Sequence, residues 1–239
     1  MSDFNFSIKN DIKATFVLDN LLLNRTPISV NDFSLSNECI VYGAGPSLKK
    51  NILDIEKYLD INSYTLIASD GATSALLEVG VNPNIIVSDL DGNMEDIIKA
   101  NKNGSYIFVH AHGDNITKLK KYVPKLKNII PTTQNKATKI VHNYGGFTDG
   151  DRAVNIACNI LSMKYIILSG MDFGDKITRY SRPETKKDIS TADNIKKKKL
   201  QYAKILIEEI ATNTNSKIVN ISNSNIKNVE NINLSKISK

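Results

Sequence analysis

Short apolar runs recur along the chain from Cys39 onward, and each is followed by a polar cluster and then by a helical pattern. The runs are rich in valine and isoleucine and apolar at successive positions, which is typical of parallel strands covered by helices on both faces. They read CIVYG, YTLIAS, NIIVS, YIFVH, NIIP, KIVHN, YIILSG and KIVNIS. The helical patterns include SALLEVG, MEDIIKAN and DRAVNIACNILS. This alternation predicts an α/β fold with a doubly wound, mostly parallel sheet flanked by helices.

The two ends of the chain depart from this pattern. The segment DIKATFVLDNLLL, residues 11–23, predicts a helix, so we expect residues 1–37 to form a small helical N-terminal extension on an α/β domain at residues 38–239. The tail from about Ser216 is rich in Asn, Ser, Ile and Lys, which favours late strands and a loosely held end over a second domain. A chain of 239 residues with 41% hydrophobic residues can bury a sizeable core.

Composition narrows the cellular setting. No apolar run approaches the roughly 18 residues of a membrane span, and MSDFNFSIKND lacks the basic start and apolar stretch of a signal peptide. Cys39 opens a predicted strand and Cys158 falls in a predicted helix, which favours free, buried thiols over a disulfide. We therefore expect a cytoplasmic protein with no membrane partner, and homo-oligomerisation stays open.

The formal net charge of +6 would suit an anionic partner, but much of the excess lies in Lys196–Lys199 and near the end of the chain. No basic stripe is interleaved with aromatic residues and no nucleic-acid motif is present, so we expect no nucleic-acid partner. A nucleotide needs far less positive surface. The lysine run opens a predicted helix, where either a solvated face or a lysine that reaches phosphate would explain it.

Polar clusters follow the predicted strands: GAGPS, SDGA, SDLDG, HAHGDN, TTQN, NYGGFTDGD and GMDFG. The carboxyl ends of parallel strands lie at one edge of an open sheet, where ligands bind. Aspartates from these clusters should therefore converge: Asp70, Asp89, Asp91, Asp114, Asp149, Asp151 and Asp172. Any one of them could simply cap a helix. The whole set, with glycine beside nearly every member, predicts a binding site.

Asp89 and Asp91 pose a specific electrostatic problem. They alternate directly after the buried run IIVS, so in extended chain they share a face about 7 Å apart. Two carboxylates there repel each other, and burying either without a partner is costly. A divalent cation resolves the conflict, since Mg²⁺ combines one or two carboxylates with water and phosphate oxygens. The same site would account for Asp114.

Two further motifs are ambiguous. The strand-to-helix turn GAGPSL at residues 43–48 can hold an anion on free N–H groups, but it has neither the Walker lysine nor the GxGxxG spacing. His110 and His112 alternate along a strand and could form a zinc site with Asp114. Alternatively, one histidine contacts phosphate while the other packs. No Ser-His-Asp order or Cys-His pair indicates covalent catalysis.

Taken in order, GAGPSL, SDGA, VSDLDG, HAHGDN, TTQN, NYGGFTDGDRAV and GMDFG resemble the archaeal 6-hydroxymethyl-7,8-dihydropterin pyrophosphokinase family of the MptE type. The resemblance runs from about Cys39 to about Ala211, and HAHGDN with GGFTDGDR is its most specific part. The expected fold is similar to the catalytic domain of thiamine pyrophosphokinases. The resemblance implies Mg²⁺-dependent transfer of diphosphate from ATP to the pterin hydroxymethyl group, with release of AMP, toward a folate-like or methanopterin-like cofactor.

The resemblance also implies roles for individual residues in residues 38–239, the expected catalytic domain. Asp89, Asp91, Asp114 and Asp149 would hold metal, Asp151 would take the hydroxyl proton, and Arg152 would neutralise developing charge. The nucleotide would be held by the GAGPS turn, with Gly43, Gly45, Pro46 and Ser47, and by Asp70. The further ligand-binding candidates are Gly71, His112, Asn115 and Gln134. For the pterin itself the candidates are Asn115, Gln134, Asn143 and Asp172, which the sequence cannot rank.

Two rival functions are weighed against this one. GAGPSL also occurs in related glycosyltransferase-like proteins, so a transferase that uses a nucleotide sugar is the alternative, although DLDG combined with FTDGDR speaks against it. A non-catalytic nucleotide sensor is the other, but it would leave so complete a set of carboxylates without a purpose.

Overall fold

The structure is a computed structural model that describes residues 7–26, 28–185 and 187–236. Its strands are β1 (Glu38–Tyr42), β2 (Thr65–Ser69), β3 (Ile85–Ser88), β4 (Tyr106–Ala111), β5 (Ile129–Thr133), β6 (Tyr165–Ser169), β7 (Lys176–Thr178), β8 (Ile189–Thr191), β9 (Lys217–Asn220) and β10 (Glu230–Asn231). Its α-helices are α1 (Ile8–Leu22), α2 (Leu48–Tyr58), α3 (Asp70–Glu78), α4 (Met94–Lys102), α5 (Ile116–Tyr122), α6 (Asp149–Asn155) and α7 (Asn194–Asn213). A π-helical segment, η6 (Ile156–Ile160), continues α6, and the short 3₁₀ helices are η2 (Val30–Asp32), η3 (Ile61–Ser63), η4 (Gly113–Asn115), η5 (Val123–Lys125) and η7 (Leu234–Lys236).

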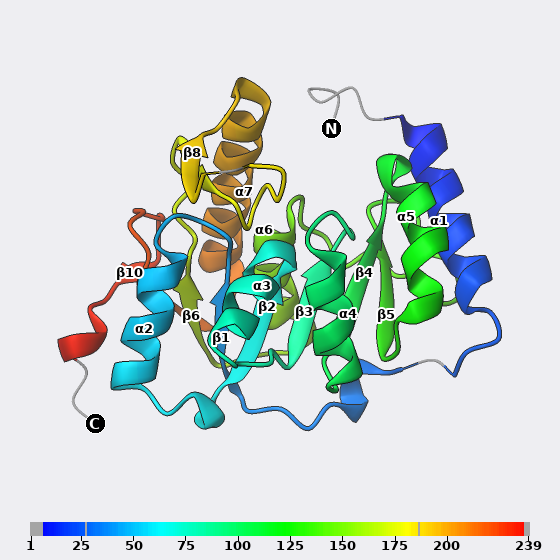
Figure 1. Cartoon of the computed structure of the whole chain (residues 1–239). Helices are drawn as coiled ribbons and strands as arrows, with labels where there is room; N and C mark the ends of the chain where they lie inside the picture. Colours follow the sequence, from blue (N-terminus) through cyan, green and yellow to red (C-terminus); the bar gives the residue numbers. More distant parts are fainter. Residues whose placement is uncertain (1–6, 27, 186, 237–239) are drawn as a thin grey trace.

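Within the described residues, eight strands form one sheet in the order β10-β9-β6-β1-β2-β3-β4-β5, and every neighbouring pair is parallel (Figure 1). The chain advances from β1 to β5 in one direction, returns through α6, and then advances from β6 to β10 in the other. The connections that follow β1 and β6 therefore lead to opposite edges of the sheet. The boundary between these two strands is a topological switch point, where open parallel sheets bind ligands. The predicted doubly wound sheet is confirmed.

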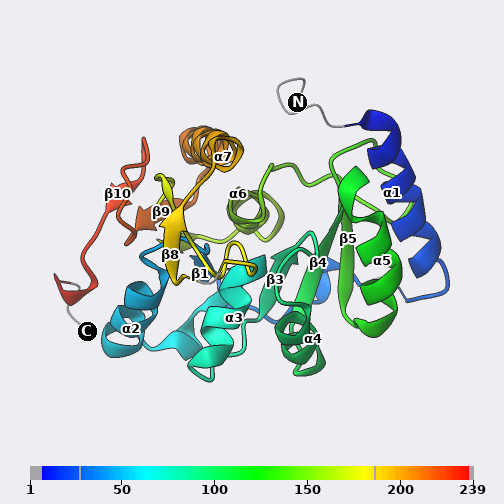
Figure 2. The ribbon, with the colours of Figure 1, turned by 45° about the horizontal axis from the view of Figure 1, so that its top comes forward.

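Helices cover both faces of the sheet, as the apolar strand sequences predict. The helices α2, α3, α4 and α5 lie on one face and α6 and α7 on the other (Figure 2). Side chains of each strand alternate between the two cores: Val87 packs with the residues of α6 and η6, whereas Ile86 packs with those of α4 and α5. The strands β2 and β3 are buried along their whole length.

The N-terminal helix α1 lies beside α5 at the β5 end of the sheet (Figure 1), and its prediction is confirmed. Ala14, Leu18 and Leu22 are buried in the same core as residues of α4, α5 and β4. The Arg25 guanidinium then donates hydrogen bonds to two backbone carbonyls in the α5–β5 connection, at 2.7 and 3.0 Å. Farther along, Phe33 crosses to the opposite face and stacks on a ring of β4.

One predicted strand is wrong. The run KIVHN, residues 139–143, forms only an isolated bridge between Thr132 and His142. Its two apolar residues follow a turn instead, because the Thr138 hydroxyl accepts the backbone N–H groups of Ile140 and Val141 at 3.3 and 3.0 Å. The short antiparallel pair β7–β8 was not anticipated from the sequence.

Two further structural expectations, on the cysteines and on the late strands, agree with the structure. Cys39 and Cys158 are free and buried, and the late strands β9 and β10 join the main sheet. Among the residues that the structure describes, no helix has the length and apolar character needed to cross a membrane.

Candidate active site

The polar clusters converge, as predicted, on one cavity of about 610 Å³ at the carboxyl ends of the strands. We refer to it as the strand-end cavity. Most of the residues singled out from the sequence line it: Gly43, Gly45, Pro46, Asp70, Gly71, Asp89, Asp91, His112, Asp114, Asn115, Gln134, Asp149 and Arg152. Ser47 and Asp151 do not contribute to the lining.

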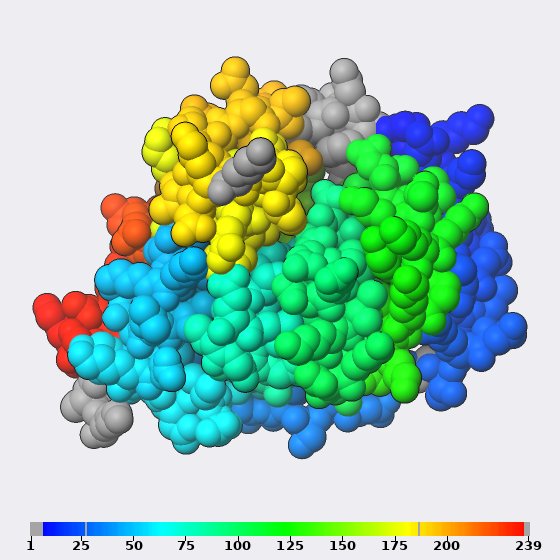
Figure 3. Space-filling model, viewed as in Figure 1, coloured from blue at the N-terminus to red at the C-terminus, as the bar shows by residue number. Residues whose placement is uncertain are grey.

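A segment that sequence reasoning missed forms the opposite wall of the cavity. The β7–β8 segment projects over the strand ends next to α2 and α3, and α7 begins behind it (Figures 1 and 3). Lys176, Arg182 and Lys196 bring positive charge to this wall. Gly71 permits the close approach, because a Cβ at that position would collide with the backbone carbonyl of Tyr180. The only signals in the sequence were scattered basic residues and the lysine run at the start of α7.

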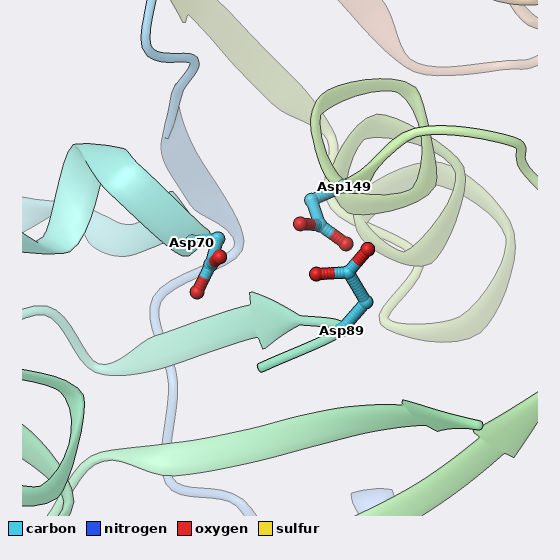
Figure 4. A group of neighbouring side chains, drawn as sticks. All are labelled: Asp70, Asp89 and Asp149. Carbon is cyan, nitrogen blue, oxygen red and sulfur yellow. The ribbon is translucent and has the colours of Figure 1, made fainter. Parts of the chain in front are cut away.

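Three carboxylates form the centre of the site. Asp70 begins α3, Asp89 follows β3, and Asp149 begins α6, so segments distant in sequence bring them together (Figure 4). One oxygen of each lies within 4.8 Å of the other two, and Oδ1 of Asp89 is buried without a hydrogen-bond partner. This is the one group of three or more potential metal-ligating side chains of this kind in the described part of the chain. Sequence reasoning had placed Asp70 with the nucleotide instead.

The mutual repulsion of these carboxylates appears in their pKa values. Burial and the neighbouring Asp89 raise the pKa of Asp70 to about 7, although the Ser88 hydroxyl opposes this by donating at 2.7 Å. Burial, Asp89 and Asp70 raise the pKa of Asp149 well above its usual range. Burial also acts to raise the pKa of Asp89, but His112, whose Nε2 lies 3.4 Å away, helps to bring it below the ordinary value.

Asp91 and Asp114 share the cavity but lie at its exposed rim rather than in the cluster. The carboxylate of Asp91 is paired with Lys118. The structure therefore confirms that Asp89, Asp91, Asp114 and Asp149 surround one cavity, whereas their metal-binding role stays a prediction.

Asp151 does not have the surroundings expected of a proton acceptor. Its carboxylate is fully buried and accepts hydrogen bonds from the backbone N–H groups of Phe147 and Thr148 and from the Thr148 hydroxyl, at 2.5 to 2.7 Å. It thus caps α6, an arrangement that disfavours acceptance of a substrate proton, and the catalytic role of Asp151 stays a prediction. The Arg152 guanidinium is buried and donates to the carbonyls of Gly145 and Phe147, and it lines the cavity as expected.

The predicted pterin-binding side chains differ in their surroundings, although Asn115, Asp172 and Gln134 all line the cavity. Asn115 and Asp172 are occupied by the protein itself: Asn115 donates to the carbonyls of Asp89 and His110, and Asp172 accepts from the backbone N–H and hydroxyl of Ser47. Asn143 lies outside the cavity lining. Gln134 lines the cavity. These contacts leave Gln134 as the best placed of the polar candidates for the pterin.

The zinc alternative is not favoured by the geometry. Nδ1 of His110 lies 3.0 Å from the Thr132 hydroxyl, and Nδ1 of His112 accepts the backbone N–H of Asp114 at 3.3 Å. The cluster instead offers only oxygen donors, which suits a hard cation such as Mg²⁺. The unpartnered Oδ1 of Asp89 and the raised pKa values of its neighbours fit a site that a divalent cation would complete.

Comparison with known proteins gives a consistent result. A family model described as 6-hydroxymethylpterin diphosphokinase MptE-like matches residues 16–178. A protein named 6-hydroxymethyl-7,8-dihydropterin pyrophosphokinase from Methanocaldococcus jannaschii is 48% identical over 216 residues, which cover 87% of this chain and 89% of the relative. Proteins of the same name from Methanothermobacter thermautotrophicus and Pyrococcus furiosus are 46% and 36% identical, and the matches cover 91% and 93% of this chain and 93% and 94% of the relatives.

A solved structure supports the fold alone. The MAf glycosyltransferase from Magnetospirillum magneticum AMB-1 matches 96% of this chain with a TM-score of 0.60 at 12% sequence identity. The chain spans only 39% of that protein.

Fold and site together define the class: a doubly wound α/β protein whose strand-end cavity combines a carboxylate cluster with basic side chains. The chain belongs to the MptE-like 6-hydroxymethylpterin diphosphokinase family.

Proposed function

We propose that this protein transfers diphosphate from ATP to the hydroxymethyl group of 6-hydroxymethyl-7,8-dihydropterin and releases AMP, in the biosynthesis of a folate-like or methanopterin-like cofactor. The observation that carries the proposal is the carboxylate cluster of Asp70, Asp89 and Asp149 in a cavity with basic walls, in a chain of this family. Free, buried cysteines are consistent with work in the cytoplasm.

Asp70, Asp89 and Asp149 would hold Mg²⁺, which when bound supplies neutralising charge on the phosphates. For Asp91 and Asp114, which lie at the exposed rim outside the cluster, this proposal replaces the predicted metal-binding role with hydrogen bonds accepted from water around the phosphates. Transfer of this kind depends mostly on positioning and charge neutralisation, so the absence of a nucleophile among these residues is no obstacle.

The chain's basic residues would bind the triphosphate from the opposite wall. Burial, the largest effect, lowers the pKa of Lys196, while the charges of Asp149 and Asp89 act to raise it. With Lys176 and Arg182 it would hold the transferred diphosphate while AMP departs. The lysine run could either form a solvated face or supply a lysine that reaches phosphate. Because Lys196 lines the cavity, we assign it the phosphate-binding role.

The nucleotide would lie at the β1 side of the carboxylates. Gly43, Gly45 and Pro46 line that end, and Gly45 is held close to β6, where a Cβ would collide with the Asp172 carboxylate and the Gly170 carbonyl. Ser47 and Asp172 tie the β1 and β6 loops together at the switch point. The nucleotide-contacting role of Ser47 becomes, in this proposal, a structural one.

The test is the identity of the adenine product. The purified protein is incubated with ATP, Mg²⁺ and the dihydropterin, and the nucleotides are separated by chromatography. We expect AMP and a pterin diphosphate in equal amounts, and an Asp89→Asn variant should form both at least about 100-fold more slowly. ADP as the product would refute the proposal, because it marks transfer of the γ-phosphoryl group alone.

A further inference from the structure

His110 is the one histidine of the cavity lining that the roles above leave without a purpose. It is the last residue but one of β4, has only 2% of its surface exposed, and lines the strand-end cavity. Nδ1 faces the Thr132 hydroxyl at 3.0 Å, whereas Nε2 is buried with no partner in hydrogen-bond geometry. A buried ring nitrogen without a partner is costly, so its presence in a cavity wall points to a ligand atom that completes it.

Gln134, at the end of the neighbouring strand β5, lies next to this ring and is fixed from behind. Its amide nitrogen donates to Oδ2 of Asp11 at 2.7 Å, and Oδ1 of the same carboxylate accepts the backbone N–H of Gly113 at 2.6 Å. A carboxylate only accepts hydrogen bonds, so the amide nitrogen must face Asp11. The carbonyl oxygen is then turned toward the His110 ring, where it acts to raise the pKa of His110 against the larger effect of burial. Asp11 belongs to α1 and is itself buried, with 4% of its surface exposed.

We propose that His110 and Gln134 bind the polar edge of the pterin, and that Asp11 is a positioning residue that fixes the Gln134 amide. The proposal rests on the proposed function and deepens it. The pyrimidine edge of a pterin carries N–H donors beside a carbonyl oxygen. Such an edge can pair with a ring nitrogen and an amide carbonyl together, whereas a phosphate offers acceptors alone.

The order of strands agrees with this placement. The glycine-rich turn at residues 43–46, proposed to hold the nucleotide, follows β1. The carboxylates of the cluster follow β2 and β3 or begin α6, whereas His110 lies in β4 and Gln134 follows β5. The acceptor would therefore approach the phosphates from the side opposite the nucleotide, as in-line transfer requires. Burial and nearby Arg152 hold the pKa of His110 well below its usual range, which keeps the ring neutral and unsuited to pairing with phosphate.

The test separates binding of the pterin from binding of ATP. His110→Asn keeps a polar atom near the position of Nδ1, which faces Thr132, but removes Nε2. We expect the KM for the dihydropterin to rise by about tenfold or more, the scale of one lost hydrogen bond to a buried group. The Kd of ATP with Mg²⁺, measured by calorimetry, should stay within about twofold, a change of less than about 0.5 kcal/mol. His142→Asn, an exposed histidine outside the cavity lining, is the matched control and should change neither value.

Two more variants test the arrangement. Gln134→Met, at a half-buried position that should tolerate the change, is expected to raise the same KM and covers the case in which His110→Asn does not fold. In Asp11→Asn, the new amide N–H₂ would face one of the two groups that donate to Asp11, the Gln134 amide or the backbone N–H of Gly113. We therefore expect a higher KM for the dihydropterin and an unchanged kcat and ATP Kd. A merely structural role for Asp11 would lower kcat and ATP affinity as well.

The failures are distinguishable. If the wild-type protein does not convert the dihydropterin, the proposed function is wrong and this assignment falls with it. If the wild-type protein is active but folded His110→Asn and Gln134→Met keep the wild-type KM for the dihydropterin, only the pterin assignment is wrong. A rise in the ATP Kd that matches the rise in pterin KM would place these residues at the nucleotide instead.

Discussion

The replacement Asp70→Asn should make the metal-free protein more stable. Asp70 is 8% exposed and lies within the cluster formed with Asp89 and Asp149. Asparagine has nearly the same shape, keeps an oxygen to accept the Ser88 hydroxyl, and removes the charge that its neighbours oppose. Its amide N–H₂ would face the backbone N–H of Gly92, which offsets part of this gain.

The size of the effect follows from the pKa. A carboxyl group whose pKa rises from 3.8 to about 7 on folding binds more protons in the native than in the unfolded state between those values. Stability therefore falls as pH rises through this window and is lowest above it. The full difference corresponds to about 4 kcal/mol, which is an upper value because the cluster titrates as a unit. We expect the variant to gain about 1 to 4 kcal/mol at about pH 8 and much less at about pH 5.

The assay is chemical denaturation in the presence of a chelator at both pH values, repeated with saturating Mg²⁺. Mg²⁺ should stabilise the wild-type protein by about 2.7 kcal/mol at a concentration 100 times its Kd, and the variant by less. Asp91→Asn is the matched control, because Asp91 is exposed at the rim and should change stability by less than about 1 kcal/mol. A destabilised Asp70→Asn protein at about pH 8 without metal, or equal stabilisation of both proteins by Mg²⁺, would refute the reasoning.

Two further predictions concern single aspartates. Asp89→Asn should lower kcat by about 100-fold or more while the fold is kept, because it removes a preorganised charge from the centre of the cluster; circular dichroism and turnover measure this, and near-full activity would remove the metal role. Asp151→Asn should destabilise the protein by about 1 to 3 kcal/mol, because an amide N–H₂ would face buried donors at the start of α6. The folded fraction of this variant should keep most of its turnover, and a loss comparable to that of Asp89→Asn would restore Asp151 as a participant in catalysis.

Strand positions could be predicted because each buried strand of this sheet is apolar on both faces. The same apolar pattern wrongly predicted a strand at residues 139–143. There the Thr138 hydroxyl accepts the backbone N–H groups of Ile140 and Val141 and so stabilises a turn. A side-chain hydrogen bond of that kind competes with strand pairing and leaves no mark on an apolar pattern. The β7–β8 pair escaped notice because its strands are three residues each and show little apolar alternation.

The position of the site could be predicted from the sequence, but the arrangement of its side chains could not. Strand ends of a parallel sheet meet at one edge, and this was enough to place Asp89 in the site. Asp149 was expected there for the wrong reason: the strand predicted before it is absent, and Asp149 reaches the site because it begins α6. The sequence could not tell that Asp70 joins them or that Asp151 turns its carboxylate back onto the start of α6, since both depend on side-chain direction. The link from Asp11 in α1 to Gln134 depends on tertiary packing across the β5 edge.

The most direct test of the central claim is which phosphoanhydride bond breaks. The protein is given the dihydropterin, Mg²⁺ and one of two ATP analogues, and products are identified by mass spectrometry. With a non-cleavable β–γ link, we expect release of AMP and a pterin that carries the intact analogue of diphosphate. With a non-cleavable α–β link, we expect binding without turnover. Transfer of the γ-phosphoryl group from the second analogue, with none from the first, would show a conventional kinase and contradict the account.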